Sequence, residues 1–381
     1  MLLLLVLSIG MRLAAQPIPT HSFYKHMRGT LDTTMQLTVD LFSHNGDISG
    51  YYYYYFPEPG NEHILHYGKT IPIKGTITAS TIILNEFSGE GSSFSGFIDS
   101  ENKISGNWIR KEYEESIPFF IQEDYSLGSL PFKYYSQTYQ ENLDIETSVP
   151  NYKPAAKIKL ILLYPDLQKG NPLKDTLDHF ITQFLINKAE SISSPKSLLD
   201  SISSDFFKSY FTATEGIEDI SSSASLNWEK NVNMDIRHNE NNIVSIKFEK
   251  YAYTGGAHGI SMTEYAVCDL VKNKKLNLND IFKENVKFEV DNILDVKLRK
   301  LNGLNTEESL REAGFFVDQM EWSDNFFINS QGIGFFYNVY EIAPYASGTT
   351  ELFIPFTEIA ALLKPNHPFL WIKKQDSSVK L

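Results

Sequence analysis

Cysteine is the scarcest residue in this 381-residue chain, which contains only Cys268. A single cysteine cannot form an intrachain disulfide, so a small disulfide-rich scaffold is excluded. It cannot build a Cys-x-x-Cys zinc site either, and the nine histidines include no His-x-x-x-His pair. We therefore predict that the protein holds no metal ion.

Positive charge is also in deficit, because 34 lysines and arginines stand against 47 aspartates and glutamates, a net charge of -13. An acidic surface repels the phosphate backbone, so we expect no nucleic-acid partner. The same charge would attract a cationic protein. The alternative is that the acidity only keeps an exported protein soluble.

Signatures of common enzyme classes are missing as well. The sequence contains neither a phosphate-binding loop nor a dinucleotide fingerprint. The nearest approach to a Gly-x-Ser-x-Gly nucleophile elbow is GSSFSG at residues 91–96, which has the wrong spacing. We therefore predict no cofactor and assign no catalytic residue, since nothing in the sequence requires an enzyme.

An apolar run of note occurs at the N-terminus, over residues 2–9, where it is too short to span a bilayer. Ala14 and Ala15 follow it and resemble a cleavage site, so residues 1–15 are predicted to be a signal peptide. No later run predicts a transmembrane helix. We expect an exported protein, periplasmic or extracellular, without a lipoprotein anchor because no cysteine lies near the cut.

Residues 23–130 are predicted to form an all-β domain, because they are rich in aromatic residues and turn signals. A glycine inside a strand pattern recurs five times, at Gly29, Gly50, Gly75, Gly96 and Gly106. Such glycines mark bulges or close backbone approaches, which predicts an antiparallel β-meander or small barrel. The tyrosine run at 51–55 would put rings on both faces of one strand, one face packed inside and the other facing solvent or a ligand. A lipid or small-hydrophobe carrier is one candidate function of such a barrel.

Residues 155–364 are predicted to form an α+β domain with helices packed on an antiparallel sheet. The polar, proline-containing segment 147–154 separates it from the first domain. Asn171 and Pro172 supply an N-cap and a first-turn proline for a helix with one apolar face. Residues 244–249 alternate between apolar and polar, which predicts a half-buried strand.

Two motifs in this second region resemble a known extracellular family. The first is YTGGAHG at residues 253–259, followed by a strand and by KLNLNDIF at 275–282; the second is YEIAPYASG at 340–348. In this order they resemble the C-terminal extracellular domain, of unknown function, shared by RsiV-type anti-sigma factors and PdaC-type peptidoglycan deacetylases. The similarity covers about residues 155–364.

The resemblance implies a binding protein of the bacterial cell envelope. In the anti-sigma factors this domain is an external sensor that binds lysozyme. In the deacetylases the chemistry belongs to a separate module, whose metal-binding motif has no counterpart in this chain. A lysozyme-like protein or peptidoglycan is therefore the expected partner.

The candidate ligand-binding residues come from the two motifs and are Tyr253, Gly255, Gly256, His258, Tyr345 and Gly348. The glycines could form a backbone nest for an anion, and Tyr253 and Tyr345 could form a shared aromatic rim for sugar rings or a protein surface. The alternative is structural: a tight glycine turn, one hydrogen bond from His258, and tyrosines that anchor loops to the core.

Catalysis at this motif is a further alternative, in which a glycan hydrolase would use His258 and a nearby carboxylate as acid and base. A histidine without a partnered carboxylate gives that alternative little support. Both motifs lie at strand ends, but the sequence alone does not show whether their loops meet.

Overall fold

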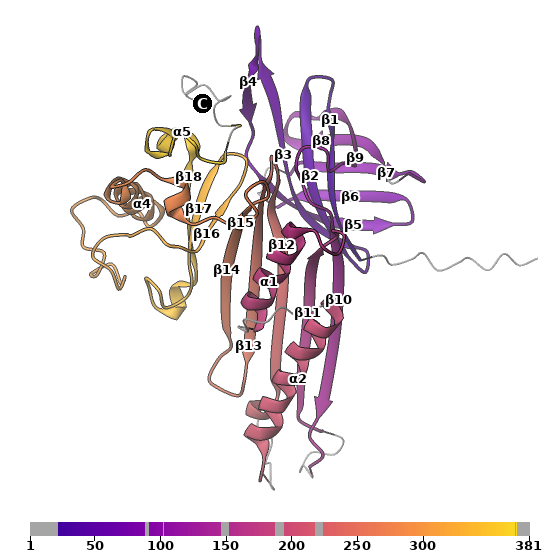
Figure 1. Cartoon of the computed structure of the whole chain (residues 1–381), viewed down its shortest axis with the longest axis vertical. Helices are drawn as coiled ribbons and strands as arrows, with labels where there is room; N and C mark the ends of the chain where they lie inside the picture. The colour runs from indigo at the N-terminus through magenta and orange to yellow at the C-terminus, as the bar shows by residue number, and fades with distance from the viewer. Residues whose placement is uncertain are drawn as a thin grey trace, which may run out of the picture.

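The computed structural model describes residues 22–87, 91–101, 103–145, 152–186, 194–217, 224–369 and 371. The predicted signal peptide, residues 1–15, and most of the segment 147–154 lie outside these ranges. The described chain forms three sheets, with the barrel at the upper right of Figure 1 and the helices α1 and α2 across the middle sheet. Among the described helices, none combines the length and the apolar character needed to cross a membrane.

The first sheet closes into an eight-stranded antiparallel barrel, which confirms the predicted all-β fold. Closure follows from pairing, since β2 is bonded to both β1 and β3 and the order continues through β9, β8, β7, β6 and β5 back to β3. The barrel strands are β1 (Phe23–Leu31), β2 (Met35–His44), β3 (Asp47–Glu58), β5 (Ile71–Thr78), β6 (Thr81–Glu86), β7 (Ser93–Ile98), β8 (Ile104–Arg110) and β9 (Glu115–Glu123). A further strand, β4 (Asn61–Tyr67), pairs only with the end of β3, and the short helix η1 (Lys111–Tyr113) precedes β9.

The recurring glycines stand where neighbouring barrel strands approach most closely. A β-carbon added at Gly75 would lie 1.7 Å from the carbonyl oxygen of Ile83, and one at Gly50 would lie 2.0 Å from that of Asp40. The other three glycines of the pattern face backbone oxygens in the same way. Close backbone approach, one of the predicted reasons for these glycines, is therefore confirmed.

Gly75→Ala is expected to lower the free energy of unfolding by about 1–3 kcal/mol, because the added methyl group would force β5 away from β6. Urea denaturation of the full chain measures this change. Gly256→Ala is the control, since a β-carbon there would meet no atom within 4 Å. Equal stability of the two variants would contradict the steric explanation.

The barrel interior is filled by apolar side chains, among them Met27, Tyr52 and Phe94. A cavity in this interior, between side chains that include Val39, Phe94 and Ile121, has a volume of about 10 Å³, about enough for one water molecule. An acyl chain needs far more room, so the interior of the described barrel gives the carrier alternative no support.

The second sheet carries the predicted α+β architecture. Its order is β10 (Phe132–Asn142), β11 (Ala155–Pro165), β12 (Trp228–Glu240), β13 (Ile243–Tyr253), β14 (Ile260–Asp269) and β15 (Lys274–Lys275). All neighbours are antiparallel except β11 and β12. These two run parallel because the connection between them contains the helices α1 (Pro172–Ile186) and α2 (Pro195–Thr214), followed by η2 (Ala224–Leu226).

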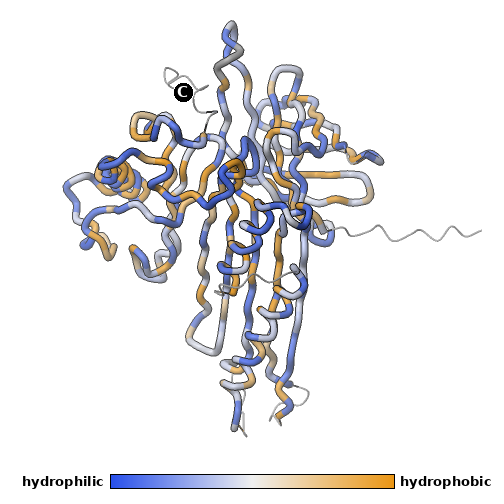
Figure 2. The backbone as a smooth tube through the Cα atoms, viewed as in Figure 1, coloured by the Kyte–Doolittle hydropathy of each residue, from blue (hydrophilic) through white to orange (hydrophobic). Residues whose placement is uncertain are grey.

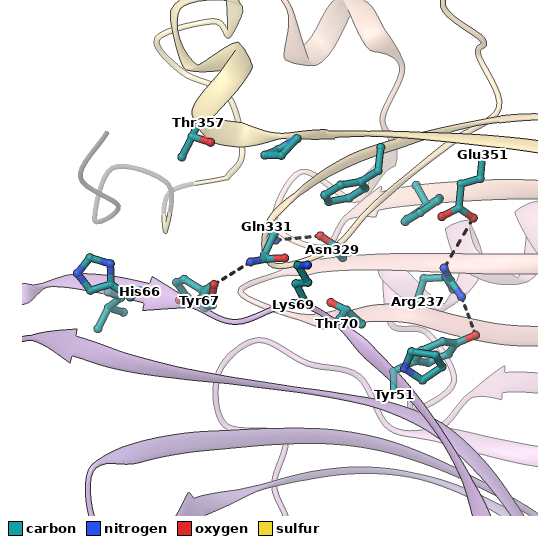
Figure 3. Close-up of a pocket in the computed structure, with 15 residues that line it drawn as sticks. Tyr51, His66, Tyr67, Lys69, Thr70, Arg237, Asn329, Gln331, Glu351 and Thr357 are labelled. Atoms are coloured by element: carbon teal, nitrogen blue, oxygen red, sulfur yellow. Dashed lines mark hydrogen bonds and ion pairs between the residues drawn. The ribbon is translucent and has the colours of Figure 1, made fainter. Parts of the chain in front are cut away.

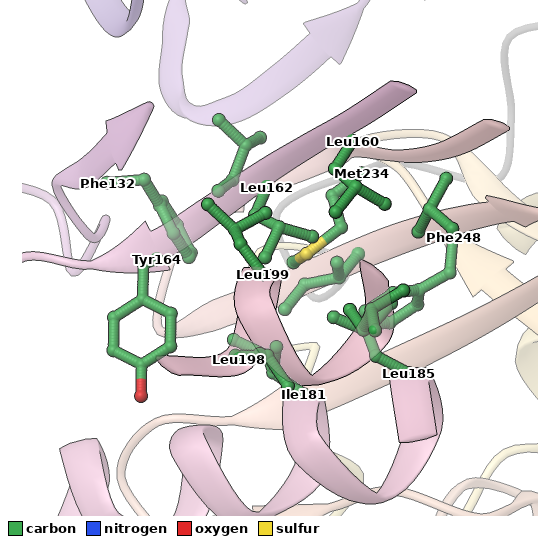
Figure 4. Packing of buried hydrophobic residues seen from close by; sticks show 14 of the residues in the cluster. Phe132, Leu160, Leu162, Tyr164, Ile181, Leu185, Leu198, Leu199, Met234 and Phe248 are labelled. Carbon is green, nitrogen blue, oxygen red and sulfur yellow. The ribbon is translucent and has the colours of Figure 1, made fainter. Parts of the chain in front are cut away.

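Helices α1 and α2 cover one face of this sheet. Asn171 caps α1 as predicted, because its side-chain oxygen accepts a hydrogen bond from the amide of Leu173 at 2.9 Å. Figure 4 shows the leucines and isoleucines of both helices packed against the strands, and the rings of Phe184 and Phe248 stack at 3.9 Å. The outward sides of the helices are mainly hydrophilic or intermediate in Figure 2.

A third sheet packs on the opposite face of the second. It consists of β16 (Phe326–Ile328), β17 (Gly332–Tyr337) and β18 (Thr350–Pro355), accompanied by α3 (Leu278–Ile281), α4 (Lys287–Leu301), η3 (Tyr345–Ser347), α5 (Phe356–Ile359) and η4 (Ala360–Leu362). Ser245, on the polar side of the alternating strand β13, is fully buried and accepts a hydrogen bond from the amide of Ile328 at 3.0 Å. The strand that was predicted to be half-buried is thus covered on both faces at this point.

The barrel is joined to the C-terminal region through buried polar side chains at the end of β12. Asn239 donates a hydrogen bond to the hydroxyl of Tyr24 at 2.9 Å. Glu240, which is 1% exposed, accepts a hydrogen bond from Tyr53 and pairs with Arg28 of β1, with Nε and Oε1 3.0 Å apart. Because these partners come from both parts of the molecule, the network fixes the barrel against the sheet.

Candidate functional site

The first motif forms the loop of the hairpin between β13 and β14. Gly255 has φ +88°, and a β-carbon there would lie 2.3 Å from the carbonyl oxygen of Ser225. Glycine is therefore required at this position for the turn itself, as the structural alternative predicts. Gly256 meets no such obstacle.

The second motif is held beside the first by an asparagine at the end of β17. Asn338 accepts a hydrogen bond from the amide of Thr263 at 2.7 Å and donates one to the carbonyl of the same residue at 3.0 Å. Its side-chain amide thereby makes the two backbone hydrogen bonds to β14 that a neighbouring strand would otherwise make. The loop that follows, residues 339–349, is brought next to the hairpin loop as a result.

The two loops meet through an exposed aromatic stack, which consists of His258, Tyr340 and Tyr345. The rings of His258 and Tyr345 are stacked, with centroids 4.1 Å apart and planes 23° apart. The ring of Tyr340 is tilted against that of Tyr345, with centroids 5.7 Å apart. Tyr345 donates a hydrogen bond from its hydroxyl to the carbonyl of Gly259 at 2.9 Å. Tyr340 and Tyr345 are 51% and 36% exposed, so the stack is ordered by contacts between loops but remains open to a partner.

Tyr253 is not a ring neighbour of Tyr345 in the described structure, and the rim of Tyr253 and Tyr345 stays a prediction. Tyr253 still belongs to β13, where it pairs with Glu229 of β12, and among the described residues the ring contacts of Tyr345 are to His258 and Tyr340. Gly348 has φ +72° and ends η3, which is a turn role like that of Gly255.

His258 lacks the environment of a general acid or base. Within the described structure, the hydrogen-bond partner of its ring is the carbonyl oxygen of Gly259, 3.0 Å from Nδ1, and no carboxylate is bonded to it. The stack is therefore better suited to binding than to proton transfer.

A second candidate site, which we call the interdomain cavity, lies between the barrel and the C-terminal region and has a volume of about 700 Å³ (Figure 3). Its walls come from β3 and the β4–β5 segment of the barrel, from β12, and from the third sheet. The wall includes the side chains of Tyr51, Tyr67, Lys69, Arg237, Phe327, Asn329, Gln331, Glu351 and Phe353. Its volume lies in the range of small-molecule sites.

Arg237 reaches this cavity because β12 is bulged at that residue. In the pairing of β12 with β13, Ile236 lies opposite Ile246 and His238 lies opposite Ser245, which leaves Arg237 unmatched. A bulge turns the extra side chain away from the regular alternation of the strand.

The guanidinium of Arg237 is sandwiched between aromatic rings, 4.6 Å from the centroid of Tyr51 and 4.9 Å from that of Phe327. Nη1 donates a hydrogen bond to the Tyr51 hydroxyl at 2.7 Å, and that hydroxyl donates to Asp235 at 2.8 Å. Nη2 lies 3.9 Å from the carboxylate of Glu351, too far for a hydrogen bond. The arginine is thus held in place with hydrogen-bonding capacity left over.

The charges around Arg237 follow from burial and proximity. Burial alone would lower the pKa of Arg237, but Tyr51, Tyr265 and Glu351 raise it above its usual value, so the guanidinium stays charged. Burial raises the pKa of Asp235 to about 6, although Arg237 opposes that shift. Asp235 lies behind Tyr51 and is not part of the cavity wall.

Sequence reasoning did not find this cavity, although one signal pointed to it. The tyrosine run was expected to face inward on one side and solvent or a ligand on the other. Tyr52 does lie in the barrel core, whereas Tyr51 lines the cavity. Arg237 carried no local signal, because its bulge depends on pairing with another strand.

Two family models match adjacent stretches of the chain. Residues 155–261 match the model described as deacetylase PdaC, and residues 279–357 match DUF3298, described as a protein of unknown function. The C-terminal region is thus similar to these two domains in sequence, which confirms the resemblance that the motifs predict.

One curated relative and two solved structures are also similar to this chain. The peptidoglycan-N-acetylmuramic acid deacetylase PdaC of Bacillus subtilis (strain 168) is 27% identical over 141 residues, which are 36% of this chain and only 30% of that protein. A DUF3298 family structure from Bacteroides fragilis NCTC 9343 aligns at 25% identity with a TM-score of 0.56, covering 65% of this chain and 100% of its own. Another from Pseudomonas aeruginosa PAO1 covers 62% of this chain and 96% of its own at 16% identity, and its TM-score of 0.43 is too low to carry an argument.

Proposed function

Since residues 155–357 of this chain contain a PdaC domain followed by a DUF3298 domain, we propose that it is a cell-wall-related binding protein exported to the envelope. Its principal partner in this proposal is a cationic, lysozyme-like protein. The aromatic stack of His258, Tyr340 and Tyr345 is the docking surface.

The observation that carries the proposal is the exposed stack itself. Stacked rings that are fixed by a hydrogen bond and still open to solvent offer a large contact area at little entropic cost. The net charge of -13 adds long-range attraction for a basic partner. The similarity to lysozyme-binding anti-sigma factors is consistent with the same class of partner.

A cell-wall glycan is the second candidate ligand of the stack. The curated relative is named for its action on N-acetylmuramic acid in peptidoglycan. Pyranose rings present apolar faces that pack on aromatic side chains, so the same surface would suit a glycan.

Hydrolysis of a glycan is less well supported than binding. Most glycosidases place two carboxyl groups on either side of the scissile bond. Within the described residues, His258 has no bonded carboxylate, and Glu351 is the single carboxylate in the wall of the interdomain cavity.

Tyr345→Ala is expected to weaken binding of lysozyme to the full chain by about tenfold or more, because it removes the central ring of the stack. Calorimetric titration with lysozyme at two salt concentrations measures both the affinity and its electrostatic part. Tyr113→Ala, which removes an exposed tyrosine on the barrel, is the control and should leave the affinity unchanged.

Sedimentation with insoluble peptidoglycan, combined with an assay for released products, separates the alternatives. Binding of the glycan but not of lysozyme would favour the second ligand. Product release that is abolished by His258→Ala would replace the binding proposal by the hydrolase. Equal losses in the Tyr345→Ala and Tyr113→Ala variants would remove the stack as the docking surface.

A further inference from the structure

The interdomain cavity has a charge opposite to that of the protein as a whole. Among the described residues, its wall contains the cations Lys69 and Arg237 and the single carboxylate of Glu351, in a chain with a net charge of -13. Glu351 is a weak counter-charge, because its carboxylate is 41% exposed and 3.9 Å from Arg237. The cavity is therefore suited to an anion.

Arg237 is positioned to bind that anion. The bulge in β12 directs it to the cavity, and the rings of Tyr51 and Phe327 hold the guanidinium plane in position. Among the described residues of the wall, the hydrogen bond of this guanidinium is the one that Nη1 donates to the Tyr51 hydroxyl. The remaining N–H groups fit the planar fork of a carboxylate.

The rest of the wall combines aromatic rings with side-chain amides that can form further hydrogen bonds. Tyr67 and Phe353 contribute aromatic side chains to it. Asn329 uses its side-chain oxygen to accept bonds from Gln331 and Gly332, which leaves its NH₂ group as a donor within the described structure. Gln331 donates to the carbonyl of Tyr67 at 2.8 Å, which leaves its own oxygen as an acceptor.

We propose that the interdomain cavity binds a saccharide that carries a carboxylate. Arg237 holds the carboxylate, Lys69 adds positive potential at the mouth, and the aromatic rings pack on the sugar. Asn329 and Gln331 bind hydroxyl or acetamido groups. The proposal does not depend on the function proposed for the aromatic stack, which lies on other loops.

Calorimetric titration of the full chain with matched sugars tests this proposal. N-acetylmuramic acid and N-acetylglucosamine differ in the lactyl ether that bears the carboxylate, and galacturonic acid and galactose form a second pair. We expect the acidic sugar of at least one pair to bind about tenfold tighter than its neutral partner, the effect of one charge-assisted hydrogen bond. Preference for the first pair identifies a cell-wall muramyl group, and preference for the second identifies a uronic acid.

Variants of the charged residues in the wall sharpen the result. Lys69→Met is expected to weaken binding of the acidic sugar severalfold, and Glu351→Gln is expected to strengthen it, because the competing carboxylate is removed. Arg237→Lys keeps the charge but loses the planar fork, so it should cost about tenfold. Lys208→Met, which removes one charge at an exposed position of α2, is the control and should change nothing.

Equal affinity for acidic and neutral sugars would overturn the proposal, as would the absence of saturable binding for all four. Weaker binding in Glu351→Gln would also contradict it, because the sign of that effect depends on an anionic ligand. Loss of lysozyme binding with sugar binding intact would affect only the function proposed for the stack.

Discussion

Glu240→Ala is expected to lower the free energy of unfolding by about 3–5 kcal/mol, the usual effect of removing one partner of a buried charge pair. Glu240 is 1% exposed, pairs with Arg28 and accepts the hydrogen bond of Tyr53. Without the carboxylate, Arg28 would lose a buried counter-charge and Tyr53 would lose its acceptor. Urea denaturation, monitored by tryptophan fluorescence, measures the loss of stability.

Glu229→Ala on the same strand is the matched control for this experiment. Glu229 is exposed at the other end of β12, so its removal should change stability by no more than about 0.5 kcal/mol. Glu240→Gln keeps an acceptor for Tyr53 and should fall between the two. Comparable stability of Glu240→Ala and Glu229→Ala would show that the network does not hold the barrel to the sheet.

Buried His238 is expected to lower the free energy of unfolding by about 2–3 kcal/mol when the pH falls from 7.5 to 4.5. Burial lowers the pKa of His238 from 6.5 to about 4; the nearby Asp40 opposes this shift and His26 adds to it. Its Nε2 lies 3.1 Å from the carbonyl of Glu240, and its ring stacks on Trp371.

The sign follows from proton binding. Between pH 6.5 and pH 4 the unfolded chain protonates His238 and the folded protein does not, so the stability present above pH 6.5 is lost as the pH falls. Asp235, whose pKa burial raises to about 6, acts in the opposite direction. His26 has a raised pKa, because Asp40 outweighs its burial, and also opposes the effect.

The comparison of the wild-type chain with His238→Gln isolates this contribution, because Asp235 and His26 are present in both. Chemical denaturation at pH 7.5 and pH 4.5 should show a larger loss for the wild type. Parallel stability profiles for the two proteins would contradict the role assigned to buried His238.

Local patterns predicted much of the fold. The recurring glycines predict the barrel, because a side chain at Gly50 or Gly75 would clash with the backbone of the neighbouring strand. Asn171 predicted the start of α1 because capping depends on neighbours two residues away. The parallel pairing of β11 with β12 was not predicted, since it depends on where a connection of some sixty residues returns to the sheet.

The candidate site was predicted less completely. Both motifs were found, but their meeting depends on Asn338 bonding to Thr263, which is 75 residues away in the chain. The predicted rim pairs Tyr253 with Tyr345 because both motifs lie at strand ends. The partner of His258 is Tyr345, since strand pairing keeps Tyr253 beside Glu229.

The sequence itself determined the absence of an intrachain disulfide, the two kinds of architecture and the family resemblance of the C-terminal region. It did so through its single cysteine, its strand glycines and its paired motifs. The aromatic stack, the buried Glu240 network and the interdomain cavity were decided only by the tertiary structure. The physical reason is that each joins side chains from strands or loops that pair at long range. Arg237 shows this most clearly, because a bulge relative to β13 turns it towards the cavity.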